Sequence, residues 1–183
     1  PKNTEGIELT IYEKMGIGTG KMANNPWLQE LPDPISKETW DNYLAISPKF
    51  ATDNDITLED LVKINGEIEL PVLYQPGQPY GTASIAMGYG RSEIGKVADK
   101  LGVNVFHMAA MRNGSKQFNV STISIEKTGK KYPLATTQTH HSMEGRPLVR
   151  ETVLDQWKEK KNAGNELHEI NEKKAVTLYK KPE

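Results

Sequence analysis

The sequence contains no cysteine in its 183 residues. This absence excludes disulfides, a cysteine nucleophile and any thiolate ligand to a metal or an iron–sulfur cluster within the chain. Long apolar runs are also missing, because no stretch approaches the roughly 20 apolar residues of a membrane-spanning helix, and no basic-then-apolar leader is present. Neither sign of charge is in excess, since 23 basic and 24 acidic residues give a net charge of -1. A field that attracts nucleic acid is therefore not expected, and any anion site must be local.

Local patterns in the first half of the chain favour strands separated by short helices. Apolar and polar residues alternate at 7–12, which predicts a half-buried strand. Asn65-Gly66 joins two β-rich runs within 61–74, and this pair is the strongest sequence signal for a two-residue hairpin turn. Asn25-Pro26 and Ser47-Pro48 each combine a capping side chain with a proline at the first helical position, so each predicts the start of a short helix.

The second half of the chain continues the same alternation of strands and short helices. The residue patterns predict a strand at 82–87, a helix at 92–101 capped by Ser92, a strand at 103–107, a hairpin of the runs 118–127 and 131–138, and a helix at 147–160. Strands interrupted by single short helices argue for a mainly β fold, a small β-barrel, rather than for a doubly wound sheet.

The barrel domain is expected to occupy residues 1–154. Residues 155–183 are highly charged and have few apolar anchors, which is typical of a loosely held helical linker toward a following domain. The chain begins at Pro1 and ends in a polar stretch. We therefore expect an excised domain of a longer polypeptide.

The most informative stretch ends in Gly88-Tyr89-Gly90-Arg91. The two glycines allow the main chain to approach a partner closely, and the planar guanidinium of Arg91 offers several hydrogen-bond donors. This combination predicts a cradle for a phosphate or a carboxylate. The alternative is an ordinary β-turn followed by an arginine that pairs with a local carboxylate.

A second glycine-rich stretch, GIGTGK at 16–21, invites a nucleotide-loop interpretation. The spacing of its glycines is too short for a P-loop, and Met22 stands where a Ser or Thr should follow the lysine. No helix is signalled after it, so a Rossmann fingerprint also fails. We expect a flexible connection, which could still line a site built by other segments.

Residues 140–146 contain the remaining candidates for chemistry. His140 and His141 would point to opposite faces of an extended chain, so they are not expected to hold one metal ion. Ser142 and Glu144 suggest a nucleophile and a base, but no nucleophile elbow or separated triad partner is visible. We therefore predict no catalytic residue and no metal ligand in this chain.

Three segments together resemble a known family: NNPWLQELPDP at 24–34, LPVLYQPGQPYGTASIAMGYGR at 70–91 and TTQTHHSMEGRPLVRE at 136–151. They are similar to the C-terminal dinucleotide-binding domain of the molybdopterin oxidoreductases. The last segment is most like the large iron–sulfur, molybdopterin-oxidoreductase-like subunit of bacterial alternative complex III. The resemblance covers roughly Gly6 to Leu154.

The resemblance implies a double-psi β-barrel that binds molybdopterin guanine dinucleotide through loops that gather at one end, so we expect these loops to converge at one mouth of the barrel. The C-terminal helical extension is expected from the charged residues 155–183. Amides would read a purine or pterin edge, glycines would admit the pyrophosphate, and arginine would neutralise it. The positions that match the ligand-facing loops of the family are Asn25, Trp27, Gln75, Gly77, Gly88, Tyr89, Gly90, Arg91, Asn104 and Gln138.

One departure from the family concerns the stretch EKMGIGTGKMA between the first strand and NNPW. Cofactor-holding relatives usually carry His, Ser, Thr and Arg there, so this chain has fewer donors for phosphates. In the alternative complex III subunit, the resemblance implies a retained scaffold from which the molybdenum cofactor has been lost. Electrons would pass through iron–sulfur clusters elsewhere in the parent chain.

Three functions follow from these observations. The first is a scaffold domain, without its own chemistry, in a membrane-associated bacterial respiratory complex that oxidises quinol. The expected location is the periplasmic face of the membrane, and the expected partners are the other subunits. The second is a working molybdopterin guanine dinucleotide-binding domain of a molybdenum or tungsten oxidoreductase. The third is a stand-alone enzyme that acts on a small anion through Arg91 and residues 142–146.

Overall fold

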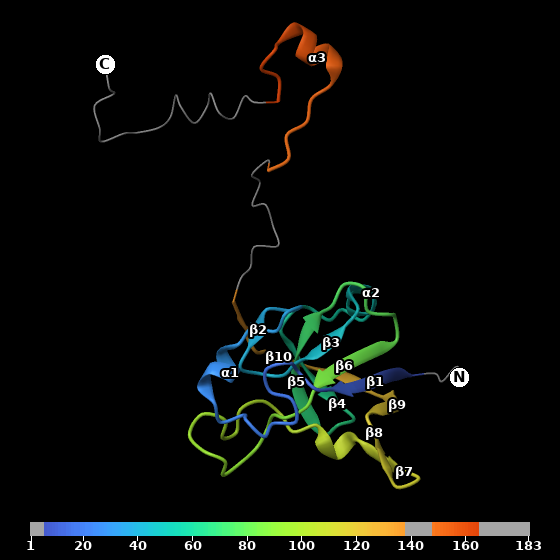
Figure 1. Ribbon diagram of the computed structural model, residues 1–183. Helices are drawn as coiled ribbons and strands as arrows, with labels where there is room; N and C mark the ends of the chain where they lie inside the picture. Colours follow the sequence, from blue (N-terminus) through green and yellow to red (C-terminus); the bar gives the residue numbers. More distant parts are fainter. Residues whose placement is uncertain (1–5, 138–147, 165–183) are drawn as a thin grey trace, which may run out of the picture. The chain divides into compact units, whose positions relative to one another are not determined.

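The structure is a computed structural model that describes residues 6–137 and 148–164 (Figure 1). Its contacts divide the chain into two compact units, residues 1–138 and residues 139–183. All described strands belong to the first unit, and the second contributes one short helix, α3 (Leu154–Glu159). The domain boundary expected after residue 154 stays a prediction. Among the described helices, none is long and apolar enough to cross a membrane.

The first unit is mainly β, as expected. Its strands are β1 (Ile7–Tyr12), β2 (Glu38–Thr39), β3 (Leu44–Ile46), β4 (Asp60–Ile64), β5 (Ile68–Tyr74), β6 (Thr82–Ala86), β7 (Ala110–Arg112), β8 (Ser115–Gln117), β9 (Asn119–Ile123), β10 (Ile125–Lys131) and β11 (Ala135–Thr136). Its helices are α1 (Pro26–Glu30), α2 (Pro48–Asp53) and the 3-10 turn η1 (Phe106–Met108).

Seven strands form one mixed sheet in the order β10-β4-β5-β3-β6-β1-β9. The strands at its two edges, β9 and β10, are consecutive in the chain and are separated only by Ser124. The sheet must therefore curl until its edges meet at that residue. Asn65 holds the meeting point, because its amide N–H donates to the Ser124 carbonyl at 3.1 Å and its side-chain oxygen accepts from the Ser124 amide at 2.9 Å.

Strand direction decides which loops lie at which end of the sheet. β1 and β6 are parallel, with Tyr12 beside Ala86, so their carboxyl ends lie together. β3 runs against β6 and alongside β5, which places Ile46 between Ala83 and Tyr74. The loops that follow β1 and β6 therefore lie at one end, and the loop that follows β5 lies at the other.

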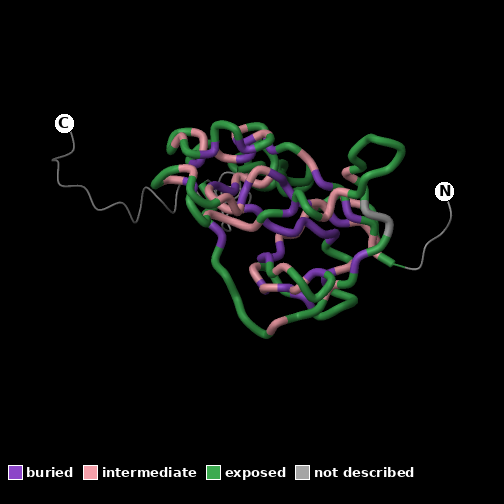
Figure 2. Tube along the Cα trace, turned by 90° about the horizontal axis from the view of Figure 1, so that it is seen from below, coloured by how far each residue is buried: buried purple, intermediate pink, exposed green. Residues whose placement is uncertain are grey.

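The core lies on the inner face of the curled sheet. Leu9, Leu44, Val72 and Ile85 are completely buried and come from four neighbouring strands. Figure 2 shows buried residues along the central strands and exposed residues in the outer loops. Each large aliphatic side chain removed from water in this way stabilises the unit by about 1.5–3 kcal/mol.

The predictions that rest on local signals are confirmed. β4 and β5 pair antiparallel, and Asn65 and Gly66 both have the positive φ that a two-residue turn requires, 52° and 71°. α1 and α2 begin at the predicted prolines. Asn25 caps α1 by accepting the Trp27 amide, and Ser47 caps α2 by accepting the Phe50 amide.

The helix predicted at 92–101 is wrong, and the residues there form turns. Glu93, Gly95 and Lys100 have positive φ values of 61°, 130° and 60°, which no right-handed helix can contain. The apolar spacing that suggested a helix instead serves a folded loop, in which Ala98 is buried. The strand predicted at 103–107 is also wrong, because its end forms the 3-10 turn η1.

The hairpin predicted from 118–127 and 131–138 is wrong as well. Its residues do form strands, but those strands pair with distant partners: β9 with β1, β10 with β4, and β11 with β2. Thr128-Gly129 lies inside β10 rather than in a turn between strands. In the second unit, the helix predicted at 147–160 is confined to α3, and Pro147 lies outside the described residues.

Candidate functional site

A cavity of about 590 Å³ lies where the chain leaves β6. Three segments line it: the GIGTGK loop, the residues that follow β6, and the residues that lead into η1. The side chains and main chain in contact with the cavity belong to Thr19, Lys21, Gly88, Tyr89, Gly90, Arg91, Ser92, Ile94, Asn104 and Phe106.

The two glycine-rich loops meet in direct main-chain contact at this cavity. A Cβ on Gly88 would lie 2.8 Å from the Gly18 carbonyl oxygen, and a Cβ on Gly20 would lie 2.5 Å from the Gly88 carbonyl oxygen. A Cβ on Gly90 would lie 2.1 Å from the Asn104 amide nitrogen. These distances are too short for any side chain, so the cavity exists in this form because three of its positions are glycine.

Positive charge at the cavity comes from Lys21 and Arg91. The Arg91 guanidinium donates to the Thr19 carbonyl at 2.8 Å, and this bond fixes its position at the junction of the two loops. Lys21 is exposed. None of the described lining residues carries a carboxylate. The cavity therefore presents two cations and no anion, which suits a phosphate or carboxylate group.

The folded loop at 91–104 forms one wall, and two asparagine side chains, one buried and one exposed, hold it in place of helical hydrogen bonds. Asn42 is completely enclosed; its side-chain nitrogen donates to the carbonyls of Ala86 and Val103, and its side-chain oxygen accepts the Val103 amide at 2.9 Å. Asn24 accepts the amides of Val97 and Ala98. Main-chain amides and carbonyls that would pair with each other in a helix or sheet thus pair with the side chains of these two asparagines.

Behind the cavity lies a buried lysine among tyrosine rings. The Lys14 nitrogen is 5.8 Å from the centre of the Tyr89 ring and 5.4 Å from that of Tyr43, and Lys14 is only 4% exposed. Burial lowers the pKa of Lys14, although the carboxylates of Asp33 and Glu38 oppose that shift. Burial also raises the pKa of Tyr89. Tyr89 is the member of this cluster that lines the cavity, and Tyr43 lines a different cavity.

The structure brings together five of the residues that the sequence singled out: Gly88, Tyr89, Gly90, Arg91 and Asn104. Asn25 and Trp27 do not line this cavity. Asn25 caps α1, and Trp27 is 80% exposed on that helix. Gln138 lies outside the described residues, as do all of residues 140–146.

Gln75 and Gly77 follow β5 and lie at the other end of the sheet. Pro76-Gly77 forms the expected turn, since the Gln78 amide donates to the Gln75 carbonyl and Gly77 has a φ of 87°. Gln75 lies level with the start of β6, with β3 between the two strands, and Gly88 follows the end of β6. Extended geometry therefore separates Gln75 and Gly88 by about 20 Å. The expectation that these loops converge at one mouth is therefore not met.

Five residues that line the cavity are not among the predicted site residues: Thr19, Lys21, Ser92, Ile94 and Phe106. Thr19 and Lys21 belong to the loop at 16–21, which was expected to be a flexible connection that could still line a site built by other segments. A partial signal for the first two was available, because glycine-rich turns can present successive backbone N–H groups to an anion.

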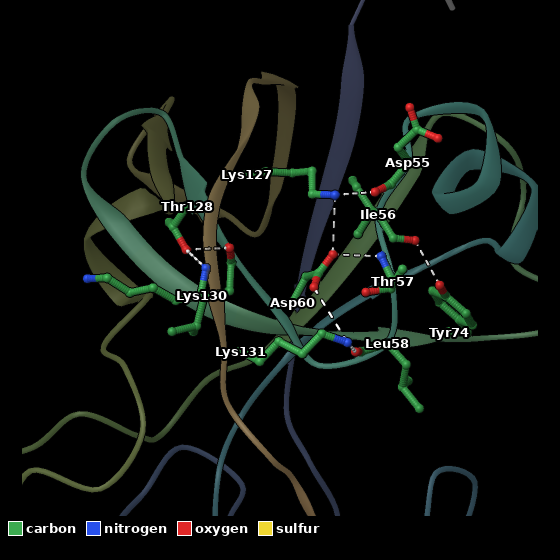
Figure 3. Close-up of polar contacts among 11 residues, drawn as sticks. Asp55, Ile56, Thr57, Leu58, Asp60, Tyr74, Lys127, Thr128, Lys130 and Lys131 are labelled. Carbon is green, nitrogen blue, oxygen red and sulfur yellow. Dashed lines mark hydrogen bonds and ion pairs between the residues drawn. The ribbon is translucent and has the colours of Figure 1, made fainter.

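A separate charged cluster around Asp60 is structural (Figure 3). The Asp60 carboxylate accepts the Thr57 amide at 2.7 Å and lies 3.5 Å from the Lys127 ammonium and 3.9 Å from that of Lys131. Partial burial raises the pKa of Asp60, but the Thr57 bonds and the two ammonium groups outweigh it and lower the pKa below its ordinary value. The cluster fastens β10 to the start of β4.

No group of three or more His, Asp or Glu residues that could hold a metal ion occurs in the described part of the chain. The sequence matches no protein-family model and no curated protein sequence.

Proposed function

We propose that this chain is a dinucleotide-binding-like domain of a molybdopterin-oxidoreductase-type iron–sulfur subunit, of the kind found in bacterial alternative complex III. The support is the resemblance carried by residues 24–34, 70–91 and 136–151. A curled, mixed sheet is compatible with a double-psi β-barrel, and we propose that topology for residues 6–137. The parent would then belong to a membrane-associated complex that takes electrons from quinol, with iron–sulfur clusters outside this chain.

Within that assignment, the function that the geometry supports best is binding the phosphate part of an anionic ligand. The observation that carries this proposal is the approach of Lys21 and Arg91 to one glycine-lined cavity that has no described carboxylate. In the parent protein, the ligand would be the pyrophosphate of molybdopterin guanine dinucleotide. Gly88 and Gly90 would admit the phosphates, and Arg91 and Lys21 would neutralise them.

A scaffold without its cofactor is the second candidate function. It is favoured by the small number of donors, because Arg91 already donates to the Thr19 carbonyl and the other predicted ligand residues, Gln75 and Gly77, lie about 20 Å away along the sheet. In that case the barrel would serve only as a contact surface for other domains and subunits.

Titration of the 183-residue chain with pyrophosphate and with GDP, at low salt and by calorimetry, separates the two functions. Anion binding predicts saturable binding that Arg91→Ala weakens by about tenfold or more, since a charge-assisted hydrogen bond contributes about 1.5–3 kcal/mol. Lys21→Ala should weaken it less, because its flexible ammonium is exposed. Lys49→Ala, a surface lysine on α2, serves as the matched control.

If neither compound binds, the anion-binding proposal is wrong and the scaffold remains. Molybdenum and guanine dinucleotide content of the intact parent protein tests the family assignment separately. Stoichiometric cofactor contradicts the scaffold, whereas clustered cysteines after Glu183 with no molybdenum support it.

A further inference from the structure

A second groove runs along the outer face of the central strands, and it differs from the glycine-lined cavity in having no cation in its described lining. Thr10 on β1 and Ser84 on β6 are directly paired, and both alternate with core residues, so both face outward. On the other side of β6, Ala45 of β3 pairs with Ser84. Tyr43 lies two residues before Ala45, so its side chain is on the same face of the sheet. The outer face thus carries hydroxyl groups on β1 and β6, two strands that lie side by side in Figure 1.

Two cavities on this face are continuous. One of about 240 Å³ reaches Tyr12, Asp33 and Tyr43, and one of about 590 Å³ extends along the loop after β5. They share the residues Ile35, Gln75 and Ser84. We call the combined space the amide groove.

The charge of the amide groove argues against an anionic ligand. None of its described lining residues is Lys, Arg or His, and Asp33 is the sole carboxylate among them. The nearby Lys14 nitrogen lies against the Tyr43 ring rather than in the lining. An anion would therefore meet one negative charge and no direct cation in this groove.

The groove also contains hydrogen-bonding groups that the fold does not use. The half-buried Gln75 amide forms no hydrogen bond with the described part of the chain, although its backbone is fixed by a bond to the Ile46 carbonyl. Asp33 is only 9% exposed, and its Oδ1 accepts the amides of Ile35 and Ser36, which leaves Oδ2 as an acceptor at the groove.

The Gln78 side chain, by contrast, already forms hydrogen bonds within the protein. Its side-chain nitrogen donates to the carbonyls of Ala45 and Thr82 at 3.1 and 3.0 Å. These bonds hold the proline turn against the sheet and leave Gln75 in a fixed place. Apolar surface completes the groove, because Ile35 is 76% exposed at the point where the two cavities meet, and Pro76 and Pro79 line one side.

We propose that the amide groove binds a neutral, polyhydroxylated ligand: a sugar, or the sugar part of a larger molecule. A planar amide, a carboxylate and hydroxyl groups can each exchange hydrogen bonds with ring hydroxyls, while proline and isoleucine contact the apolar C–H faces of the ring. The lack of cations in the described lining distinguishes this ligand from the phosphate-bearing one. The proposal is independent of the proposed anion site.

Saturation-transfer NMR on the 183-residue chain tests the proposal with glucose, galactose, mannose and maltose as probes. At least one sugar should receive saturation on its ring protons. Gln75→Leu keeps the size of the side chain but removes the amide, so it should weaken binding about fivefold, the effect of losing a hydrogen bond of about 1 kcal/mol. Asp33→Ala would disturb the turn at Ile35, so Asp33→Asn is the informative second variant.

Lys21→Ala, in the other cavity, should leave sugar binding unchanged. The proposal is overturned if none of the four sugars receives saturation, or if Gln75→Leu and Asp33→Asn both bind as the wild type does. Saturation of a neutral capped peptide, but of no sugar, would also overturn it and assign the groove to peptide binding.

Discussion

The glycine-lined cavity and the amide groove lie on either side of the tyrosines that surround Lys14, yet they are built in opposite ways. The cavity is formed by main chain in contact with main chain, and its charge comes from Lys21 and Arg91. The groove is formed by side chains that project from paired strands, and it has no described cation.

This difference predicts how each site tolerates change. A site made of close main-chain contacts allows no added atom, because the backbone cannot rotate away as a side chain can. A site made of side chains on a regular sheet can exchange them while the sheet persists. We therefore expect substitutions at the cavity to affect folding, and most substitutions at the groove to affect only binding.

The largest expected effect is that of Gly90→Ala. The new Cβ would lie 2.1 Å from the Asn104 nitrogen, at a φ of 65°. Left-handed strain of about 1–2 kcal/mol and overpacking of about 1–3 kcal/mol should together lower the free energy of unfolding by about 3 kcal/mol or more. Urea denaturation followed by circular dichroism measures the change.

Gly77→Ala is the matched control in the groove. Gly77 also has a positive φ, 87°, but nothing lies within 4 Å of the added Cβ. Only the strain of about 1 kcal/mol should remain. Equal losses in the two variants would contradict the distinction between the sites.

A second comparison concerns the side-chain amides that hold the loops. Asn42→Ala removes three hydrogen bonds and leaves buried groups of Ala86 and Val103 without partners, so we expect a loss of about 3 kcal/mol. Gln78→Ala removes two bonds to main-chain carbonyls and a long one, 3.4 Å, from the Ser84 hydroxyl, all at a half-buried position that water can reach, so we expect about 1 kcal/mol. Thermal unfolding of both variants at one pH measures the difference.

The opposite pKa shifts of two buried carboxyl groups give a third, smaller test. The pKa of Asp60 is lowered in the fold, so its contribution is present above the unfolded pKa of about 3.9 and is lost as the pH falls through the lower folded value. Asp60→Asn should cost about 1 kcal/mol at pH 7, because the ion pairs with half-exposed lysines are screened. The cost should shrink below pH 4, and Asp53→Asn on the surface should cause none.

Glu38 should behave in the reverse way, with the smallest effect. Burial raises the pKa of Glu38, and its Oε2 has no partner among the described residues. Its contribution is therefore fully present below the unfolded pKa of about 4.3 and is lost as the pH rises through the folded value. Glu38→Gln should gain up to about 1 kcal/mol at pH 7 and nothing at pH 4. Stability that falls at pH 7 in this variant would contradict the assigned shift.

The parts of the fold that the sequence predicts correctly are those set by adjacent residues. The Asn65-Gly66 hairpin and the proline starts of α1 and α2 depend on turn and cap chemistry within four residues. The failed predictions depend on distant partners. Nothing near β9 and β10 indicates that they pair with β1 and β4, more than 50 residues earlier in the chain.

The candidate site follows the same rule. The local sequence at 88–91 is enough to predict an anion cradle, and the structure places these residues at a cavity. The contact of that cradle with Gly20, and the support from Asn42, are long-range and leave no local pattern. The separation of Gln75 from Gly88 follows from strand direction, which residue spacing does not encode.

The closure of the sheet at Ser124 has a consequence for synthesis. β1 and β4 receive their outer partners only when β9 and β10 are present, at the end of the first unit. A nascent chain that stops before Ile125 would expose the open edge of β4, which invites pairing with a neighbouring molecule. Nascent chains from which β10 has not yet emerged should therefore depend on chaperones more than chains in which Lys131 is already outside the ribosome.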